Sequence, residues 1–440
     1  MTGEKKLLKE HKAKIARRTL RVGVIGLGYV GLPLAVGFAK AGFPVTGIDV
    51  DLSKVDRLRR GVSYVLDVHS SDVRSLVRSS RLKATSDYKA LSGLDAVIIC
   101  VPTPLSKTKK PDISFVMDAA TRISKYLRRG QLVILESTTY PGTTEEVVLP
   151  ILEQSGLKAR KDFFLAFSPE RIDPGNKNFD ALSIPKIVGG TDRGSSEAAG
   201  LLYGSIMKRV VRVSSAKTAE MVKCLENTFR SVNIGLINEM ALLCNRLGID
   251  IWEVIEAAKT KPFGFMPFYP GPGLGGHCLP IDPLYLSWKS RVHGFEARMV
   301  ELAAAINEEM PRHVVDRVTT LLNDQDIPLH NAAVLVLGVS YKRNIDDVRE
   351  SPALDVIQRL LEKGAQVTYS DPFVKSLKVG CHSFRSSALT PEFLKKQACV
   401  VVVTDHSAFN YGAVAKHARL ILDTRNVMRS YGPRKGLFFL

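Results

Sequence analysis

The fold of the first half of the chain is decided by the stretch RVGVIGLGYVG, residues 21–31. A β-branched run leads here into Gly26, Gly28 and Gly31, and a segment of helix length follows. The first glycine of such a turn permits a sharp bend, the second lets a pyrophosphate approach the backbone, and the third lets helix and strand pack closely. The next apolar run ends at Asp49, about 20 residues after the middle glycine, where a carboxylate meets the ribose hydroxyls of NAD. The sequence therefore predicts an NAD-binding site on a Rossmann-like unit.

Other residues near this turn are candidate cofactor contacts. Tyr29 and Val30 belong to the turn itself, and Lys54 follows the acid on the same loop and helix. The acid repels a 2′-phosphate and favours NAD over NADP, whereas Lys54 leaves NADP as an open alternative. Thr103 and Thr138 each follow an expected strand, at the edge of a parallel sheet where ligands bind.

Apolar β-branched runs alternate with segments of helix length over residues 21–213 and again after residue 327. Runs that are apolar on both faces and separated by helices are typical of a parallel sheet covered on both sides. We expect strands at 22–25, 45–48, 96–101, 132–136, 163–167, 186–189 and 210–213, and later at 333–337, 366–369, 399–404 and 420–422. The pattern predicts two α/β domains that could share one fold.

The middle of the chain, residues 214–326, is predicted to be mainly helical. A pair of serines offers an N-cap for a helix that is expected to run through Gly235 and stop at Gly248. Because its apolar residues cover most of its circumference, we expect it to be buried between two domains or against a second subunit. A second helix, over 295–322, contains Pro311 and is expected to be broken or kinked there.

This layout predicts four segments: a basic N-terminal helix or extension, an NAD-binding domain, a helical centre with the cysteine loop, and a C-terminal domain, over residues 1–20, 21–213, 214–326 and 327–440. The extension is rich in lysine. We expect a solvated helix rather than a nucleic-acid-binding arm, because no aromatic residue interleaves its charges to stack on bases.

Composition argues against several classes of protein. The 440 residues are 45% hydrophobic and 24% charged, the balance of a globular chain, and 62 Lys and Arg against 44 Asp and Glu give a net charge of +18. The six cysteines form no CxxC pair, and no apolar run approaches the roughly 20 residues of a membrane span. We therefore expect a cytoplasmic protein with reduced thiols, no metal site and no membrane association.

The most unusual segment is PGPGLGGHCLPID, residues 270–282, whose four glycines and three prolines exclude regular structure. Such a loop can present the thiol of Cys278 to a substrate, or it can be a structural loop around a buried cysteine. Glu220, Lys223 and Asn227 share one face of the long helix. The lysine and asparagine either stabilise an alkoxide or thiolate, or belong to a local salt bridge.

Together these motifs resemble the UDP-glucose/GDP-mannose dehydrogenase family over nearly the whole chain after residue 20. The matching stretches are GLGYVGLPLA (26–35), ICVPTP (99–104), ESTTYPGT (136–143), FSPERIDPGN (167–176), AEMVKCLEN (219–227), PGPGLGGHCLPIDP (270–283), YKRNIDDVRESP (341–352) and DTRN (423–426). The resemblance implies an α/β fold of two Rossmann-like domains joined by a central, mainly helical dimerisation domain. It also implies a homodimer or higher oligomer that oxidises the C6 alcohol of a UDP-sugar to a carboxylate, with two NAD+ per turnover.

The resemblance further implies the residues that do this chemistry. Cys278 would be the nucleophile, because a thiol adds to the aldehyde formed first and carries it through a thiohemiacetal to a thioester. The other catalytic residues would be Lys223 and Asn227 for oxyanions, Asp282 for water, Thr138 for positioning the reacting group and Glu170 for thioester hydrolysis. Arg349 would lie near NAD. The substrate-binding residues would be Glu170, Arg171, Lys223, Asn227, Tyr269, Gly273, Lys342, Arg425 and Arg298, the last reaching a neighbouring subunit.

Two departures from the familiar UDP-glucose enzymes bear on the substrate. His277 precedes the cysteine in place of Ser, and Pro174 replaces a second acid after Glu170. The chain resembles the branch that acts on UDP-N-acetylhexosamines, with UDP-N-acetylglucosamine 6-dehydrogenase as the first choice and surface polysaccharide as the destination of the product. The alternatives are UDP-glucose or UDP-N-acetylmannosamine as substrate, a two-electron hydroxy-acid dehydrogenase of the same layout, and a binding protein whose charge engages nucleic acid or anionic lipid.

Overall fold

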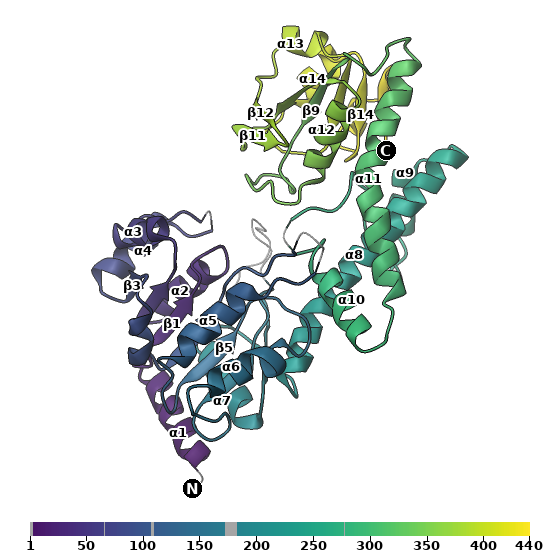
Figure 1. The fold of residues 1–440 in the computed structure, drawn as a ribbon. Helices are drawn as coiled ribbons and strands as arrows, with labels where there is room; N and C mark the ends of the chain where they lie inside the picture. The colour runs from purple at the N-terminus through teal and green to yellow at the C-terminus, as the bar shows by residue number, and fades with distance from the viewer. Residues whose placement is uncertain (1–2, 66, 107–109, 172–182, 277) are drawn as a thin grey trace. The chain divides into compact units, whose positions relative to one another are not determined.

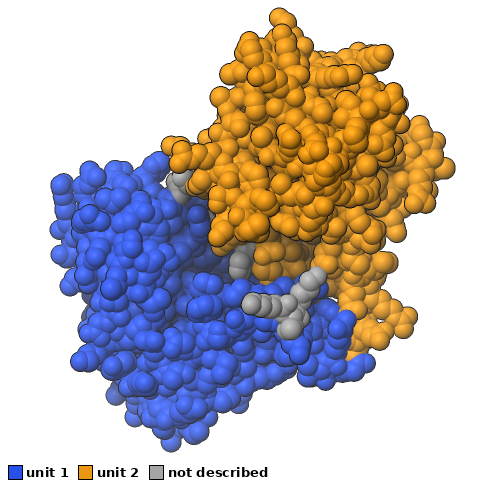
Figure 2. Space-filling view, turned by 45° about the horizontal axis from the view of Figure 1, so that its top comes forward, with its two compact units in different colours: residues 1–226, 284–294 blue, residues 227–283, 295–440 orange. Residues whose placement is uncertain are grey.

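The computed structural model describes residues 3–65, 67–106, 110–171, 183–276 and 278–440. The chain forms two compact units, which Figure 2 colours separately. Unit 1 comprises residues 1–226 and 284–294, and unit 2 comprises residues 227–283 and 295–440. Each unit is therefore built from two separate stretches of chain.

Unit 1 contains an eight-stranded sheet with the order β3-β2-β1-β4-β5-β6-β7-β8. Its strands are β1 (Val22–Ile25), β2 (Val45–Ile48), β3 (Leu82–Thr85), β4 (Ala96–Ile99), β5 (Leu132–Leu135), β6 (Phe164–Phe167), β7 (Lys186–Gly190) and β8 (Val210–Arg212). Its helices are α1 (Gly3–Ala16), α2 (Gly31–Lys40), α3 (Leu52–Arg59), α4 (Ser70–Arg78), α5 (Ser114–Ser124), α6 (Leu149–Glu153), α7 (Arg193–Tyr203), the first part of α8 (Ala216–Leu247) and all but the first two residues of α10 (Asp282–Val292).

Alternate residues of the central strands enter two hydrophobic cores, one on each face of the sheet. Val24 and Ile98 pack with residues of α2, α4 and α7, whereas Ile25 and Ile99 pack with residues of α5 and α6. These four side chains are at most 1% exposed, and burying each contributes roughly 1.5–3 kcal/mol. Figure 1 shows α5 and α6 together over β5. The predicted sheet with helices on both faces is confirmed.

Two strands of unit 1 differ from the prediction. β7 runs antiparallel to β6, with Ala166 opposite Gly190 and Phe167 opposite Gly189, so an entirely parallel sheet is wrong. The apolar pattern of a strand is the same in either direction, and it therefore carried no sign of this reversal. β3 is absent from the expected strands because only Leu82 of its four residues is buried.

α1 is less solvated than its charge predicts. His11 and Ile15 are buried, and Nε2 of His11 lies 2.5 Å from the carbonyl oxygen of Gly130. Burial lowers the pKa of His11, so the ring is neutral at pH 7 and donates its Nε2 proton to that carbonyl. Lys14 donates to the buried carboxylate of Asp95 at 2.9 Å. The expected helix is thus solvated on most of its surface, and one face of it packs on the domain.

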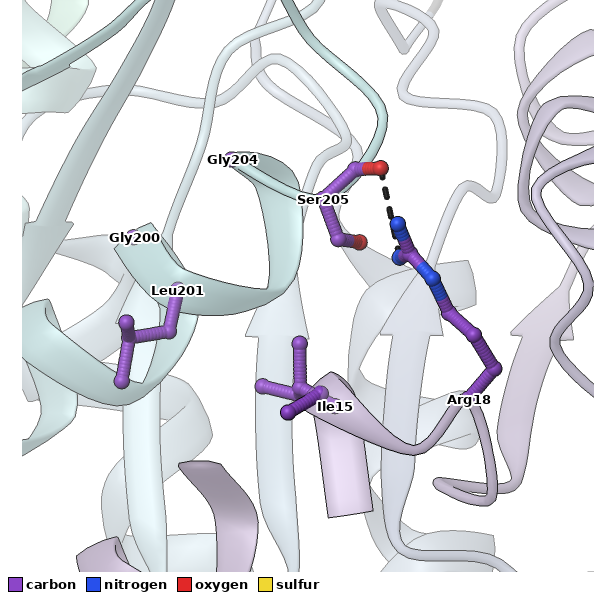
Figure 3. A pocket seen from close by; sticks show the side chains of 7 residues that line it. Ile15, Arg18, Gly200, Leu201, Gly204 and Ser205 are labelled. Atoms are coloured by element: carbon purple, nitrogen blue, oxygen red, sulfur yellow. Dashed lines mark hydrogen bonds between the residues drawn. The ribbon is translucent and has the colours of Figure 1, made fainter. Parts of the chain in front are cut away.

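A cavity of about 330 Å³ lies between the end of α1 and the end of α7. It is lined by Ile15, Arg18, Leu201 and small residues in and just after the two helices. Figure 3 shows Arg18 reaching the carbonyl oxygen of Ser205, a distance of 3.3 Å. Because Arg18 precedes β1 and the glycine turn follows it, this cavity lies at the edge of the sheet away from the predicted NAD site.

Unit 2 is built around α8 and α11 (Arg298–Asn323), which run side by side in Figure 1. α8 continues through Gly235 as predicted, and a Cβ atom there would lie 3.1 Å from Cα of Ala303 on α11. α11 runs unbroken through Pro311, so a break there is wrong, whereas the alternative of a kink stays a prediction. Pro311 and its neighbours Met310 and Val314 are buried, and packing on both sides of the proline maintains the helix despite the lost hydrogen bond.

Apolar side chains of α8 remain exposed in this chain. The exposed residues are Met221, Leu225, Phe229, Leu236, Leu243 and Leu247. The expectation that α8 is buried on nearly all sides is therefore wrong for the chain by itself, and burial against a second subunit stays a prediction.

The second sheet is a parallel one with the order β10-β9-β13-β14-β15. Its strands are β9 (Ala333–Leu337), β10 (Gln366–Ser370), β13 (Cys399–Val402), β14 (Ile421–Asp423) and β15 (Leu437–Phe439), and a separate hairpin joins β11 (Ser376–Val379) to β12 (His382–Arg385). The further helices are α9 (Ile251–Ala258), α12 (Pro352–Glu362), α13 (Pro391–Lys395) and α14 (Tyr411–His417). The sequence did not predict β11, β12 or β15. Among the described helices, none has both the length and the hydropathy that a membrane span requires.

The two sheets share one local arrangement after their first strands. The N–H of Leu27, after β1, donates to Oδ2 of Asp49 at 2.8 Å, and the N–H of Val339, after β9, donates to Oδ2 of Asp371 at 2.8 Å. Each acid directly follows the adjacent strand, β2 or β10. In unit 2 the Nε2 atom of His406 also lies 2.9 Å from Asp371. The expectation of two Rossmann-like ends around a helical centre is confirmed.

The close crossing of α8 and α11 predicts that a large side chain at Gly235 destabilises the protein, and Gly37 in α2 supplies a comparison at an open position. Gly235→Leu should lower the free energy of unfolding by on the order of 2 kcal/mol, because the new side chain meets Ala303. Gly37→Ala in α2, where a Cβ atom meets nothing within 4 Å, should raise it by roughly 0.5–1 kcal/mol. Denaturant unfolding of both variants measures this, and equal effects would contradict the close crossing.

Candidate active site

The glycine turn of unit 1 leaves room for a dinucleotide phosphate. Gly26 has φ +88°, and a Cβ atom on it would lie 2.4 Å from the carbonyl oxygen of Cys100. A Cβ atom on Gly31 would lie 1.8 Å from the carbonyl oxygen of Gly26, whereas one on Gly28 would meet no atom within 4 Å. The fold thus requires the first and third glycines, and the second leaves the backbone open to a ligand. This arrangement fits the pyrophosphate of NAD.

Asp49 is held beside this turn by backbone donors. Its carboxylate is 6% exposed and accepts from the N–H of Leu27 at 2.8 Å and the N–H of Asp51 at 2.9 Å. A carboxylate has about four lone-pair sites, so it can still accept from ribose hydroxyls. Nζ of Lys54 lies 3.5 Å from Oδ2 of Asp49. This ion pair engages Lys54 with the acid rather than leaving it for a 2′-phosphate.

The other predicted cofactor residues of unit 1 differ in exposure. Tyr29 is exposed, Val30 is half-buried and Thr103 is buried. The hydroxyl of Tyr285 donates to the carbonyl oxygens of Thr103 and Pro104, at 2.6 and 2.9 Å. Tyr285 therefore holds the loop that follows β4. Sequence reasoning missed this contact, which joins residues far apart in the chain.

Glu220 of α8 holds the turn that contains the half-buried Thr138. Its carboxylate accepts from the N–H of Gly142 at 2.5 Å and from the N–H and hydroxyl of Thr144 at 2.8 and 2.7 Å. Burial raises the pKa of Glu220 to about 7, although these donors favour the ionised form. Glu220 thus anchors a turn through these hydrogen bonds rather than through a local salt bridge. Lys223 follows on α8 and is buried.

In unit 2, Cys278 lies in an exposed turn that leads into α10. Its carbonyl oxygen accepts from the N–H of Ile281 at 3.1 Å and of Asp282 at 2.8 Å. Asp282 begins α10 and is 2% exposed, and Nδ2 of Asn227 donates to its Oδ2 in a short hydrogen bond. The alternative of a buried structural cysteine is wrong. His277 lies outside the described residues.

The loop before Cys278 is anchored by two buried asparagines. The N–H of Gly271 donates to Oδ1 of Asn238 on α8 at 3.0 Å, and Nδ2 of Asn238 donates to Oδ1 of Asn307 on α11 at 2.8 Å. Gly273 has φ +128°, and a Cβ atom on it would lie 3.2 Å from the carbonyl oxygen of Asn307. Sequence reasoning missed both asparagines, although a polar residue on an apolar helix face is a signal of such a network.

Two predicted ligand-binding residues reach the same loop. A Cβ atom on Gly271 would lie 2.7 Å from a guanidinium nitrogen of Arg425, whose Nε donates to the carbonyl oxygen of Val403 at 2.9 Å. The N–H of Gly276 donates to the carbonyl oxygen of Arg349 at 3.1 Å. The C-terminal domain therefore contributes both side-chain and backbone contacts to the cysteine loop.

The remaining predicted substrate residues of unit 2 are spread more widely. Tyr269 stacks on Trp252 with ring centroids 6.0 Å apart. Lys342 is half-buried in the loop after β9. Arg298 begins α11, and its side chain is 87% exposed. An exposed cation at a helix end is compatible with the predicted role toward another subunit, which stays untested.

Glu170 and Arg171 of unit 1 are both engaged by neighbours. Oε1 of Glu170 accepts from the N–H of Arg171 at 2.7 Å, and its Oε2 lies 3.1 Å from Nζ of Lys186. The guanidinium of Arg171 donates to Glu226 at 2.6 Å. Pro174 lies outside the described residues.

Comparison with known proteins gives the family. The NAD binding domain of the UDP-glucose/GDP-mannose dehydrogenase family matches residues 20–207, its central domain residues 217–309 and its UDP binding domain residues 335–430. The chain belongs to this family. Its NAD binding domain contains the glycine turn and Asp49, and the chain is an NAD-dependent UDP-sugar dehydrogenase.

Several family members resemble the chain over nearly its whole length. A UDP-N-acetyl-D-glucosamine 6-dehydrogenase from Pseudomonas aeruginosa is 38% identical over 400 residues, which cover 90% of this chain and 93% of that protein. A UDP-N-acetyl-D-mannosamine dehydrogenase from Pyrococcus horikoshii is 35% identical over 426 residues, 96% of this chain and 98% of that protein. The solved structure of a UDP-D-ManNAc dehydrogenase from Pyrococcus horikoshii has a TM-score of 0.87 at 34% identity and covers 96% of this chain and 98% of that one. These names leave the sugar open.

The geometry of the glycine turn predicts that one glycine substitution weakens cofactor binding and another weakens folding. Gly28→Ala should leave thermal stability unchanged but weaken NADH binding at least tenfold, because the new methyl group meets no protein atom. Gly31→Ala should lower the free energy of unfolding by roughly 1–3 kcal/mol, since its Cβ overlaps the Gly26 carbonyl. Calorimetric NADH titration and thermal unfolding measure the two effects, and an unstable Gly28→Ala protein would contradict the assignment.

The raised pKa of Glu220 predicts a pH-dependent stability difference. The folded carboxyl keeps its proton to about pH 7, whereas an ordinary glutamate releases it near pH 4.5. The folded state therefore binds more protons between these values, and its stability falls as pH rises through this window. Glu220→Gln should match the parent protein in denaturant unfolding at pH 5 and exceed it at pH 8. A variant that is less stable at both pH values would show that Glu220 is already ionised.

Proposed function

We propose that the chain oxidises the C6 hydroxyl of a UDP-N-acetylhexosamine to a carboxylate, with UDP-N-acetyl-D-glucosamine as the substrate and surface polysaccharide as the destination of the product. The observation that carries the proposal is an exposed thiol, Cys278, four residues before the buried carboxylate of Asp282, which Asn227 holds by a hydrogen bond.

The thiol is suited to an oxidation that passes through an aldehyde. Bound NAD+ supplies the hydride acceptor, and the four electrons of the reaction require two equivalents. The Cys278 thiolate adds to the aldehyde carbon, which keeps the intermediate covalently bound and prevents its release. The resulting thiohemiacetal is oxidised to a thioester, and hydrolysis then releases the acid and the thiol.

Other side chains would handle protons and oxyanions. Lys223 and Asn227 lie one turn apart on α8 and would stabilise the negative oxygen of each tetrahedral species. Asp282 would orient or deprotonate water, and Thr138 would position the reacting water or hydroxyl. Glu170 would assist thioester hydrolysis as a general base.

For the nucleotide sugar we propose cationic and loop contacts. Tyr269 and Gly273 would wrap the substrate, Lys342 and Arg425 would contact the nucleotide sugar, and Arg171 would reach the sugar or pyrophosphate. Arg349 would lie near NAD. Such cations account for part of the net charge, because they would face a dianionic substrate or the cofactor pyrophosphate.

We also propose that the chain acts as a cytoplasmic homodimer. The exposed apolar residues of α8 supply the interface, since a contiguous apolar face of this kind marks association. Arg298 would then reach the site of the second copy.

The choice of sugar follows the relative named as a UDP-N-acetyl-D-glucosamine 6-dehydrogenase, at 38% identity. UDP-N-acetyl-D-mannosamine is the nearest alternative, because a relative named for it is 35% identical. UDP-glucose is the third candidate.

A panel of UDP-sugars with NAD+ tests the proposal. UDP-N-acetylglucosamine should give two NADH per molecule of acid, the four-electron stoichiometry. Cys278→Ala should form no acid, because no thioester can form. Product analysis with NADH absorbance measures both, and UDP-glucose and UDP-N-acetylmannosamine serve as matched substrates. One NADH per product, or full activity of Cys278→Ala, would favour the two-electron alternative, and no NADH with any N-acetyl sugar would remove the proposed substrate.

A further inference from the structure

The reversed strand β7 brings a lysine to the edge of the sheet where Glu170 lies. Because β7 is antiparallel to β6, its first residue, Lys186, lies at the edge where the parallel strands end. Nζ of Lys186 forms a short ion pair with Oε1 of Glu136, which directly follows β5, and lies 3.1 Å from Oε2 of Glu170, which follows β6. The three side chains are 4%, 0% and 13% exposed. One buried cation thus joins two acids from neighbouring strands.

Tyr203 of α7 completes this cluster. Its hydroxyl donates to Oε2 of Glu136 at 2.5 Å, and its ring centroid lies 5.2 Å from Nζ of Lys186. Burial raises the pKa of Glu136 to about 7. Burial also lowers the pKa of Lys186, but Glu136 and Glu170 more than offset this, so the ammonium stays protonated. Near neutral pH the cluster can therefore gain one proton on the fully buried Glu136.

Both carboxylate oxygens of Glu170 are held in place by neighbouring groups. Oε2 faces Lys186, and Oε1 accepts from the N–H of Arg171 at 2.7 Å. Buried ion pairs contribute little to fold stability, because the loss of hydration offsets the attraction between the charges. The arrangement has a more specific effect, since it holds one carboxylate in one orientation.

We infer that Lys186 is a positioning residue for Glu170. The inference rests on the proposed function, in which Glu170 assists hydrolysis of the Cys278 thioester. In that step water adds to the thioester carbon and passes a proton to Glu170. The C–S bond then breaks, and sulfur leaves with the electron pair as thiolate. Lys186 keeps Glu170 ionised and oriented until the water arrives.

Removing the lysine charge and removing the Glu136 carboxyl should affect the reaction differently. In Lys186→Met the loss of the cation should raise the apparent pKa of the low-pH limb, called the acid limb, in the pH profile of product release. Product release should slow at least tenfold, and the thioester should accumulate on Cys278. Glu136→Gln fixes the neutral form that Glu136 already takes below about pH 7, so its acid limb should stay at the parent position and no thioester should accumulate. Lys186→Arg should restore most of the rate.

Acid-quenched intact-mass spectrometry of the full chain, mixed with NAD+ and UDP-N-acetylglucosamine or whichever panel sugar is oxidised, measures the thioester. The rate of product release, measured over a pH series, gives the apparent pKa of the acid limb. Lys14→Met is the matched control, because Lys14 pairs with buried Asp95 before β4, at the opposite edge of the sheet. It should accumulate no thioester.

The outcomes separate this inference from the proposed function. If the parent protein makes no acid from any UDP-sugar, the function itself fails and the inference falls with it. If the parent makes acid while Lys186→Met releases it at the parent rate without a thioester, or Glu136→Gln shifts the acid limb and accumulates the thioester as Lys186→Met does, the inference alone is overturned. Should Lys186→Met not fold, the charge-matched Lys186→Met/Glu136→Gln protein decides, because accumulation of its thioester supports positioning and a parent-like release rate refutes it.

Discussion

A buried carboxylate must find hydrogen-bond donors, and this requirement shapes the loops of the candidate site. Asp49 takes its donors from the glycine turn, Glu220 from the turn after β5, and Asp371 from the loop after β9. Asp282 is paired with Asn227, and Glu136 with a lysine and a tyrosine. An unpaired charge in these places would cost several kcal/mol. Each acid therefore links the strand or helix on or beside which it lies to the group that supplies its hydrogen-bond donor.

Features governed by neighbouring residues could be predicted from the sequence. The spacing of Gly26, Gly28 and Gly31 depends on sterics within one turn, and the structure places a blocking atom at the first and third positions. Asp49 follows from the length of one strand–helix–strand unit. The helix through Gly235 could be predicted as well, because one glycine costs only about 1 kcal/mol in a long helix.

Features governed by distant partners could not be predicted in this way. The direction of β7 depends on its pairing with β6, and its own residues fit either direction. Asn238 and Asn307 find each other across two helices, and α11 survives Pro311 because both sides of the proline are buried. The role of Lys186 also depends on distant partners. Its importance is visible only once the reversed strand places it beside Glu136 and Glu170.

The boundary between the two compact units falls inside α8, after residue 226. A second boundary falls inside α10, after residue 283, and only the third, after residue 294, lies outside a helix. A chimera of two related proteins could exchange unit 1, which carries the glycine turn, or unit 2, which carries Cys278. A crossover at either of the boundaries inside α8 and α10 would divide a continuous helix. Recombination that respects the architecture has to cross over where the chain is not helical, such as residues 213–215 before α8 or residues 324–332 after α11. A chimera made there keeps α8 and α10 whole and takes them from a single parent.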